Sequence, residues 1–361
     1  MSGWRYFATK LNGDGTETML ADDLPILGAE VIDDLSGPGA LTGSVSPEVS
    51  RLKVGNRPIF KAWSTAIYAE KDGRIRGGGI LTTPTVAGPT LDLECVGFTG
   101  YAAEMPYTSE YAKTGVDPLD VVRHIWAHLQ GKAGGNLGLE VDDTKSPVRI
   151  GGSIGSQEGT YKLNWWSTDD LGDEFNKLAA ETPFDYRVEH TMSGEVISHK
   201  LILGYPRLGR RRHDLRFVVG ENVLAVPDIG FGGDNYADEV LVLGAGEGRT
   251  MIRASASRPS DRLRRVAIVE AKNLRKKNDA AILAEREVKL RTDDPEIADE
   301  IILTDHPNAR IGTYSVGDEI LLQTPAGWTE GQAEWHRILS MTLSPEANTV
   351  TLTIARAEKV T

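Results

Sequence analysis

The sequence has few of the features that mark a chemically specialised or membrane-bound protein. Cys95 is the only cysteine among 361 residues, so neither an intrachain disulfide nor a cysteine metal site is expected; it lies in an alternating apolar run, where a buried structural thiol is expected. No window approaches the roughly 18 consecutive apolar residues of a membrane span. Residues 1–6 lack the basic and apolar stretches of a secretion signal, so synthesis and folding in the cytoplasm are expected.

Positive charge is also scarce. The net charge of −12 argues against a general nucleic-acid-binding surface, which needs a clustered excess of lysine and arginine. The exception is the arginine segment, which consists of Arg207, Arg210, Arg211, Arg212 and Arg216. In an acidic chain this local basic patch predicts docking to an acidic partner or to phosphates. A solvated loop between strands is the alternative.

Glycine, by contrast, is abundant. The 39 glycines among 361 residues are a larger fraction than the roughly 7% of average usage. They lie beside segments with strand-like alternation, which predicts an antiparallel, turn-rich architecture. Asp72-Gly73 is a hairpin signal, and Gly77-Gly78-Gly79 predicts a bulge or a close backbone approach. Strands are expected at residues 4–11, 59–70, 91–95, 195–203, 215–219, 239–243, 300–303, 319–323 and 349–354.

Helical patterns interrupt these strands at three places. Asp117 is a good N-cap, and the proline that follows it fits the first position of a helix. Pro183 stops the second helix, and mixed charge marks the solvated side of the third. Helices are expected at residues 118–130, from 167 or 168 to 182, and at 278–291.

One succession of strands and turns occurs twice. Val54-Gly55, a strand, a polar turn, residues 74–81 and a further strand follow one another in the N-terminal third. Val316-Gly317, a strand, a polar turn, residues 335–339 and a further strand follow one another near the C-terminus. The order and spacing match although residue identity is low. This echo predicts two related β-barrel modules, with chance similarity between hairpins as the alternative.

Several catalytic motifs occur without the context that their chemistry requires. His124 and His128 can reach one metal from a helix, but the glutamate of a zinc-hydrolase helix and a third ligand are missing. Ser153 satisfies the G-x-S-x-G pattern, but no helical pattern follows it. Residues 244–248 are rich in glycine, yet β-like residues 250–254 follow instead of a helix N-terminus. A hairpin turn is therefore expected there.

Acidic pairs and tryptophans are the remaining candidates for chemistry. Neighbouring carboxylates cannot flank a scissile bond together, so caps and solvated loops are expected for Asp142-Asp143, Asp169-Asp170 and Asp293-Asp294. Trp165-Trp166 can stack on sugars, but burial beside a helix start is the expected role. No catalytic residue, cofactor site or metal site is predicted.

Several short segments appear in an order that is typical of one family, although no segment alone is diagnostic. They are residues 59–63, 74–81, 94–98, 101, 105–107, 118–122, 165–166, 183–186, 220–223, 242–246 and 316–319. In this order, over nearly the whole chain, the sequence resembles the minor tail proteins of siphophages that infect actinobacteria, which are related to the baseplate-hub proteins of contractile phages.

The resemblance implies a mainly β fold with α+β insertions, built from two tube-type antiparallel β-barrel modules and peripheral regions that contain helices. The implied boundaries are 1–104 for the first barrel module, 105–199 for a helix-containing insertion, 200–232 for the start of the second barrel module, 233–304 for a peripheral α/β region and 305–361 for the remainder of the second barrel module.

The resemblance also implies a structural role without catalysis and without a cofactor. In that family a homotrimer forms a tail-tip or baseplate-hub ring, in which two barrels per chain match a hexameric tail tube, and the ring passes DNA on ejection without binding it specifically. The implied partners are further copies of the chain, the distal tail ring, the tape measure, and fibre or spike proteins. The implied location is the distal end of the phage tail in the virion.

Two other functions remain as alternatives. A tail-associated cell-wall hydrolase requires a groove with convergent carboxylates or a metal, and the sequence offers neither pattern. A module that binds carbohydrate on the host surface would use Trp165 and Trp166 as its aromatic platform.

Overall fold

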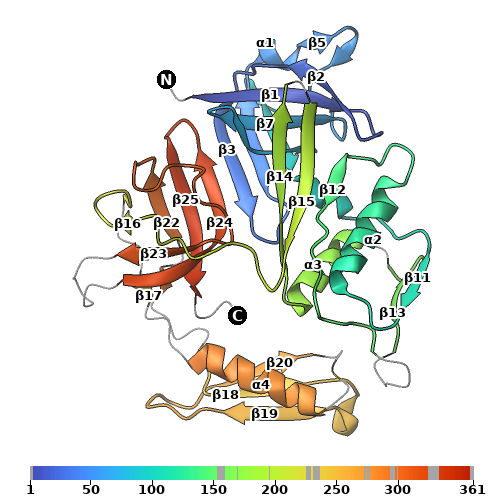
Figure 1. Ribbon diagram of the computed structural model, residues 1–361, viewed down its shortest axis with the longest axis vertical. Helices are drawn as coiled ribbons and strands as arrows, with labels where there is room; N and C mark the ends of the chain where they lie inside the picture. Colours follow the sequence, from blue (N-terminus) through green and yellow to red (C-terminus); the bar gives the residue numbers. More distant parts are fainter. Residues whose placement is uncertain are drawn as a thin grey trace. The chain divides into compact units, whose positions relative to one another are not determined.

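The computed structural model describes residues 3–152, 159–168, 170–194, 196–224, 229–230, 236–271, 274, 277–292, 297–298, 300–323 and 333–357. The chain divides into two compact units. The larger unit contains Met1–Val226 and Glu300–Ile354, and the smaller contains Pro227–Asp299 and Ala355–Thr361. The predicted fold class, mainly β with helix-containing insertions, is confirmed (Figure 1).

A 13-stranded sheet runs through the larger unit. Its N-terminal half, blue in Figure 1, contains β1 (Trp4–Leu11), β2 (Glu17–Ala21), β3 (Leu27–Asp34), β4 (Ala40–Val45), β7 (Thr65–Lys71), β8 (Arg74–Leu81), β9 (Thr85–Ala87) and β10 (Thr90–Val96). Its C-terminal half contains β16 (Phe217–Val218), β22 (Glu300–Thr304), β23 (Glu319–Gln323), β24 (Ala333–Ser344) and β25 (Thr349–Arg356).

The two halves repeat one order of strand pairing. In the N-terminal half the order is β7–β8–β10–β4, and in the C-terminal half it is β23–β24–β25–β22. Each is a three-strand meander whose last strand pairs with a strand from earlier in the chain. The internal echo in the sequence thus corresponds to a repeated order of strand pairing, and its interpretation as two related barrel modules stays a prediction. β3 and β24 join the halves, because Val31 to Asp34 pair antiparallel with Leu343 to Ser340.

The strand ladders of the described residues do not close either half into a complete barrel. In the C-terminal half, the segment after β16 runs beside β22, where Leu224 N donates to Ile302 O over 2.9 Å. In the N-terminal half, β14 (Asp185–Ser193) and β15 (Val196–Gly204) form a hairpin whose Val188 and Met192 pack against the cluster around Tyr68. The two predicted barrels are thus β-rich modules that share one sheet.

One predicted strand in the N-terminal half is shorter than expected. The alternation over 59–70 predicts one long strand, but β7 begins only at Thr65. Trp63 has a φ of 56°, and Ser64 N donates to Lys61 O, so a turn occupies the first part of the segment. Cys95 is buried in β10 as expected, and burial raises the pKa of its thiol.

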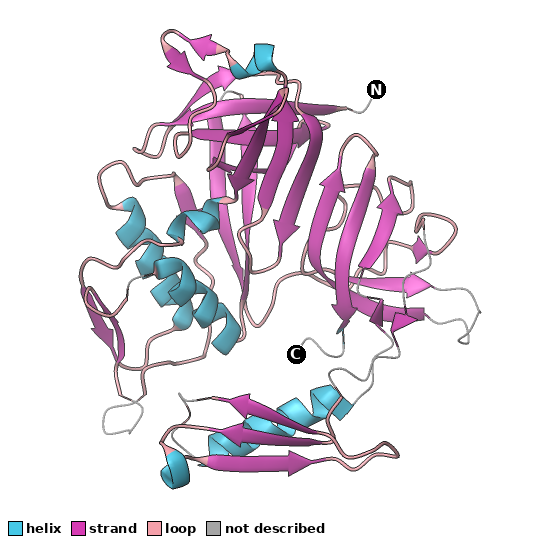
Figure 2. Ribbon diagram, turned by 180° about the vertical axis from the view of Figure 1, so that it is seen from behind, coloured by secondary structure: helices cyan, strands magenta, loops and turns pink. Residues whose placement is uncertain are grey.

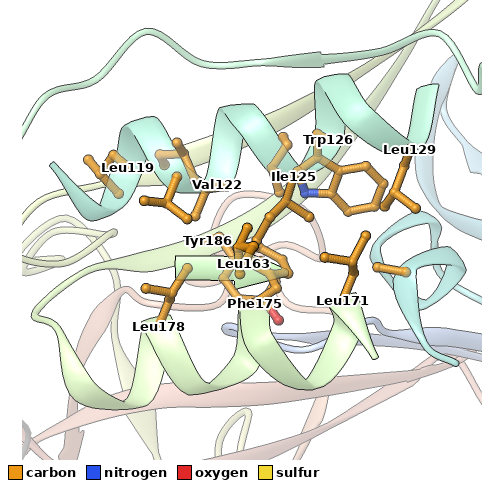
Figure 3. Packing of buried hydrophobic residues seen from close by; sticks show 14 of the residues in the cluster. Leu119, Val122, Ile125, Trp126, Leu129, Leu163, Leu171, Phe175, Leu178 and Tyr186 are labelled. Atoms are coloured by element: carbon orange, nitrogen blue, oxygen red, sulfur yellow. The ribbon is translucent and has the colours of Figure 1, made fainter. Parts of the chain in front are cut away.

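Two helices in the larger unit enclose an apolar cluster of their own (Figure 3). Helix α2 (Pro118–Gln130) begins where Asp117 Oδ1 accepts from Leu119 N over 3.0 Å. Helix α3 (Leu171–Glu181) begins after the N-cap Asp170, not at 167 or 168, since those two residues form a turn whose amides donate to Asn164 O. Trp126 and Phe175 meet edge to face between the helices, with their ring centroids 6.2 Å apart.

Short elements complete the larger unit. They are α1 (Pro47–Ser50), β5 (Lys53–Val54), β6 (Arg57–Pro58), η1 (Phe98–Ala102), β11 (Glu110–Lys113), β12 (Leu139–Val141) and β13 (Tyr161–Asn164). β12 pairs parallel with β15, and β11 pairs antiparallel with β13.

The smaller unit is a three-stranded sheet with one helix on it (Figure 2). It contains β17 (Ile229–Gly230), β18 (Glu239–Leu243), η2 (Gly248–Thr250), β19 (Arg253–Ser257), β20 (Val266–Glu270), α4 (Lys277–Thr292) and β21 (Ile297–Ala298). Ala280, Ala284 and Val288 of α4 form a core with Val240 and Val242. The glycine-rich residues 244–248 lead into η2 and then β19, so the expected β-like run begins a few residues late.

Candidate functional site

Backbone bonds and carboxylates hold the arginine segment against the start of β23. Arg212 N donates to Glu319 O over 2.8 Å, and Glu319 N donates to Arg210 O over 2.9 Å. The buried Glu319 carboxylate accepts from Arg207 Nη1 over 3.0 Å and from Arg211 Nε over 2.7 Å. These groups line a small cavity of about 190 Å³. The sequence predicts an acidic partner for these arginines, and Glu319 of the same chain is such a partner for Arg207 and Arg211.

Arg212 differs from the rest of the arginine segment because its guanidinium is inside the protein. The residue is 6% exposed. Its Nε and Nη2 donate to the Asp214 carboxylate over 2.8 and 2.6 Å, and its Nη1 donates to Asp318 Oδ2 over 3.1 Å. These carboxylates raise the pKa of Arg212. The Arg212 guanidinium is thus bound inside the chain, whereas Arg207, Arg210, Arg211 and Arg216 are exposed. Docking by the five residues of the arginine segment stays a prediction.

The two helical histidines are engaged with neighbouring side chains. Tyr107 Oη lies 2.8 Å from His124 Nε2, and Thr108 N donates to His128 Nε2 over 3.3 Å. Burial lowers the pKa of both imidazoles, with nearby lysines acting in the same direction. Within the part of the chain that the structure describes, no cluster of three or more potential metal ligands occurs.

The other candidate motifs have different outcomes. Trp165 and Trp166 are 61% and 58% exposed and meet edge to face, so the expectation that they are buried is wrong. Ser153, Asp169, Asp293 and Asp294 lie outside the described residues. Asp142 closes a local turn by accepting from Thr144 N over 2.7 Å, as expected for a loop carboxylate. No helix in the described residues is long and apolar enough to span a membrane.

A buried polar network that the sequence analysis did not find lies between β2, β7 and the β14–β15 hairpin. Glu17 Oε1 accepts from Tyr68 Oη over 2.7 Å and lies 2.8 Å from His199 Nε2, and His199 Nδ1 lies 2.8 Å from His190 Nδ1. Burial, with His199 next to it, holds the pKa of His190 well below its usual range. If His199 is neutral and donates to the carboxylate, its other nitrogen accepts from His190, so each tautomer fixes the next.

A cavity of the larger unit lies where both halves of the sheet and the β14–β15 hairpin meet. Its volume is about 550 Å³, within the roughly 300–1,000 Å³ of small-molecule sites. The titratable groups in its wall are Asp33, Arg74, Arg76, Arg187, Glu189 and His190. Burial raises the pKa of Asp33 to about 7, although Arg187 opposes this shift. Neither Asp33 nor Arg187 could be predicted as a site residue, because nothing local in the sequence shows that β3, β8 and β14 converge.

Comparisons with known proteins give the fold but no sequence family. No family model matches the chain, and no curated protein matches it. Among solved structures, a 43 kDa tail protein of prophage MuSo2 from Shewanella oneidensis is similar, with a TM-score of 0.59, 12% identity and 99% of each chain covered. A tail protein from Neisseria meningitidis has a TM-score of 0.56 and 12% identity, with 99% of this chain and 98% of the other covered.

A prophage tail protein from Listeria monocytogenes, gp18, is also similar, with a TM-score of 0.54, 9% identity, and 98% of this chain and 95% of the other covered. Identities this low establish the shared fold only. The match nevertheless runs from end to end in all three pairs, through both halves of the sheet and the regions between them. The chain therefore has the fold of phage tail proteins.

Proposed function

We propose that the chain is a structural subunit of a phage tail tip, which acts by assembling and not by catalysis. The observation that carries the proposal is the match over nearly the full length of prophage tail proteins, 99% of each chain in one case. Folds host many functions, so the repeated order of strand pairing in the two halves is a second, independent support. Two similar modules in one chain suit a subunit that must fit a ring of higher symmetry.

In the form that the sequence resemblance suggests, the subunit is a homotrimer at the distal end of the tail of a siphophage that infects actinobacteria. Its two modules per chain match a hexameric tube, and the ring joins the tube to the tape measure, the distal tail ring, and fibre or spike proteins. We expect subunit interfaces beyond the roughly 2,000 Å² typical of obligate contacts. The net charge of −12 suits passage of DNA through the ring on ejection, because like charge repels phosphate.

Labelling the assembled particle tests this function. Antibody raised against the purified chain, with a gold conjugate, is applied to intact particles and viewed by electron microscopy, with pre-immune serum as the control. We expect label at the distal end of the tail. Label on the capsid, or particles that carry the chain nowhere, contradicts the proposal. Native mass spectrometry of tail tips released from particles, rather than of the free subunit, tests the trimer, because the free chain can remain monomeric until assembly.

A second candidate function has one observation in its favour. Trp165 and Trp166 are exposed, with ring centroids 5.3 Å apart, and exposed aromatic side chains are a common platform for sugar rings. A module that binds carbohydrate on the host surface predicts binding to a glycan array that disappears in a Trp165→Ala, Trp166→Ala double variant. A folded parent protein that binds no glycan removes this candidate.

A further inference from the structure

The wall of the 550 Å³ cavity contains polar groups that the described residues leave unsatisfied. Arg76 Nε, Arg187 Nε and Tyr314 Oη are buried and have no hydrogen-bond partner, and Tyr314 as a whole is 3% exposed. Buried donors without partners are rare in folded proteins, and each one calls for a physical account. Three of them around one cavity indicate that the cavity receives a group that accepts hydrogen bonds.

Strand β8 also presents an incomplete edge to this cavity. It pairs with β7 along its length, from Lys71 opposite Arg74 to Ala66 opposite Ile80. On its other edge, among the described strands, it pairs with β10 only at Ile80 and Leu81. The first part of β8, from Arg74 to Gly78, lines the cavity. Alternate backbone N–H and C=O groups of such an edge are available to an added strand.

A β-bulge accounts for the direction of Arg76. The register against β7 shifts between Ile75 and Gly77, which leaves Arg76 as the extra residue of β8. Bulges change the direction of a side chain and commonly lie beside functional sites. Arg76 Nη1 reaches Gly312 O at a distance of 3.5 Å, at the end of hydrogen-bonding range. A Cβ at Gly77 would clash with Val31 Cγ1 and one at Gly78 would clash with the Tyr68 ring, so these glycines let the neighbouring side chains pack closely against the faces of β8.

The charges in the wall favour a ligand with one negative charge. Arg74, Arg76 and Arg187 supply three positive charges, and Asp33 and Glu189 supply two negative charges when both are ionised. Glu189 already pairs with Arg187 Nη2. With Asp33 ionised the net balance is one positive charge, which suits a single carboxylate better than a phosphate dianion. With Asp33 protonated, near and below its pKa of about 7, the balance is two positive charges. Apolar side chains such as Val188, Met341 and Leu343 complete the wall, which suits apolar neighbours of that carboxylate.

We propose that this cavity binds an extended segment of another protein that carries one carboxylate between apolar residues. The segment adds as a strand to the edge of β8 from Arg74 to Gly78, and its carboxylate accepts hydrogen bonds from Arg76, Arg187 and Tyr314. Strand addition of this kind takes affinity from the main chain and specificity from the side-chain pockets. Only the identity of the protein that supplies this segment, a neighbouring tail protein, rests on the proposed function.

Binding of synthetic peptides to the purified full chain tests the site. The probe is the acetylated, amidated peptide Thr-Val-Glu-Val-Thr, measured by isothermal titration calorimetry at pH 7. The control peptide has Gln in place of Glu and should bind about tenfold more weakly, because it loses charge-assisted hydrogen bonds. Equal binding of the two peptides overturns the proposal, and so does binding of inorganic phosphate without binding of the Glu peptide.

Two further comparisons separate the pocket from the strand edge. Tyr314→Phe removes a hydroxyl without an internal partner, so the variant should fold normally and bind the Glu peptide about tenfold more weakly. Tyr236→Phe, in the smaller unit, is the control and should bind as the parent does. Two peptides N-methylated on alternate amides should differ, because an added strand uses only alternate N–H groups. No loss in Tyr314→Phe, or equal binding of both methylated peptides, overturns the proposal, whatever the outcome of the labelling experiment.

Discussion

Replacement of Arg212 by methionine should destabilise the protein far more than the same change at Arg210, two positions earlier. Arg212 is 6% exposed and donates to Asp214 and to the buried Asp318. The Arg210 side chain is exposed, and the hydrogen bond from Arg210 to Asp318 comes from the backbone amide, which methionine keeps. Removal of one partner from a buried ion pair costs about 3–5 kcal/mol, whereas an exposed surface change stays within about 0.5 kcal/mol.

Urea unfolding of the two variants measures this difference. For a chain of this length a slope of about 3 kcal/mol per molar urea is expected, so Arg212→Met should lower the midpoint of the larger unit by about 1 M or more. Arg210→Met should leave the midpoint nearly unchanged. Equal midpoints for the two variants would refute the reasoning, because the buried ion pair would then contribute no more than a surface charge. The comparison also tests whether all residues of the arginine segment form one surface patch, or whether Arg212 differs from the exposed arginines by stabilising the fold.

Three further predictions concern the core, the 550 Å³ cavity and the buried network. Phe175→Ala should lower the free energy of unfolding by about 3–5 kcal/mol through loss of core packing, and a loss below about 1 kcal/mol would contradict the core in Figure 3. Burial raises the pKa of Asp33 to about 7, so the folded state holds a proton that the unfolded chain releases near pH 4. The free energy of unfolding therefore falls as the pH rises from about 4 to about 7. The free energy of unfolding of Asp33→Asn should therefore equal that of the parent below about pH 4 and exceed it above pH 7 by at most roughly 4 kcal/mol, measured by thermal or urea unfolding. If the difference between variant and parent does not change with pH, the carboxyl is not buried as described. His199→Leu should cost about 1–3 kcal/mol, since Glu17 loses a buried hydrogen-bond partner, and a stability equal to the parent's would show that the network contributes nothing.

The local signals in the sequence were enough to locate the three longer helices and part of the strands, but β3, β4 and β14 were not predicted. The expected helix at 118–130 matches α2, since Asp117 and Pro118 define its first turn. The expected helix at 278–291 differs from α4 by one residue at each end. The long strand over 59–70 was wrong because the left-handed backbone of Trp63 is set by the turn and not by alternation. Alternation alone reports which face a residue prefers and not whether the chain reverses.

Sites assembled from distant segments were beyond the reach of the sequence. Asp33, Arg76 and Arg187 line one cavity although they come from β3, β8 and β14, and no spacing in the chain encodes their meeting. The pair of His190 and His199 was within reach, because a hairpin centred on Gly194 places them opposite each other. The exposure of Trp165 and Trp166 was not, since an aromatic side chain beside a helix start is usually buried.

The ladder between β3 and β24 makes the order of synthesis matter for this protein. Val31 to Asp34 leave the ribosome about 300 residues before their partners at Ser340 to Leu343, and ribosomes add roughly 5–20 residues per second. For that interval one edge of β3 has no partner strand, and an open edge invites pairing with other chains. A fragment that ends before β24 should therefore aggregate, and chaperone binding to nascent chains should fall once β24 has emerged.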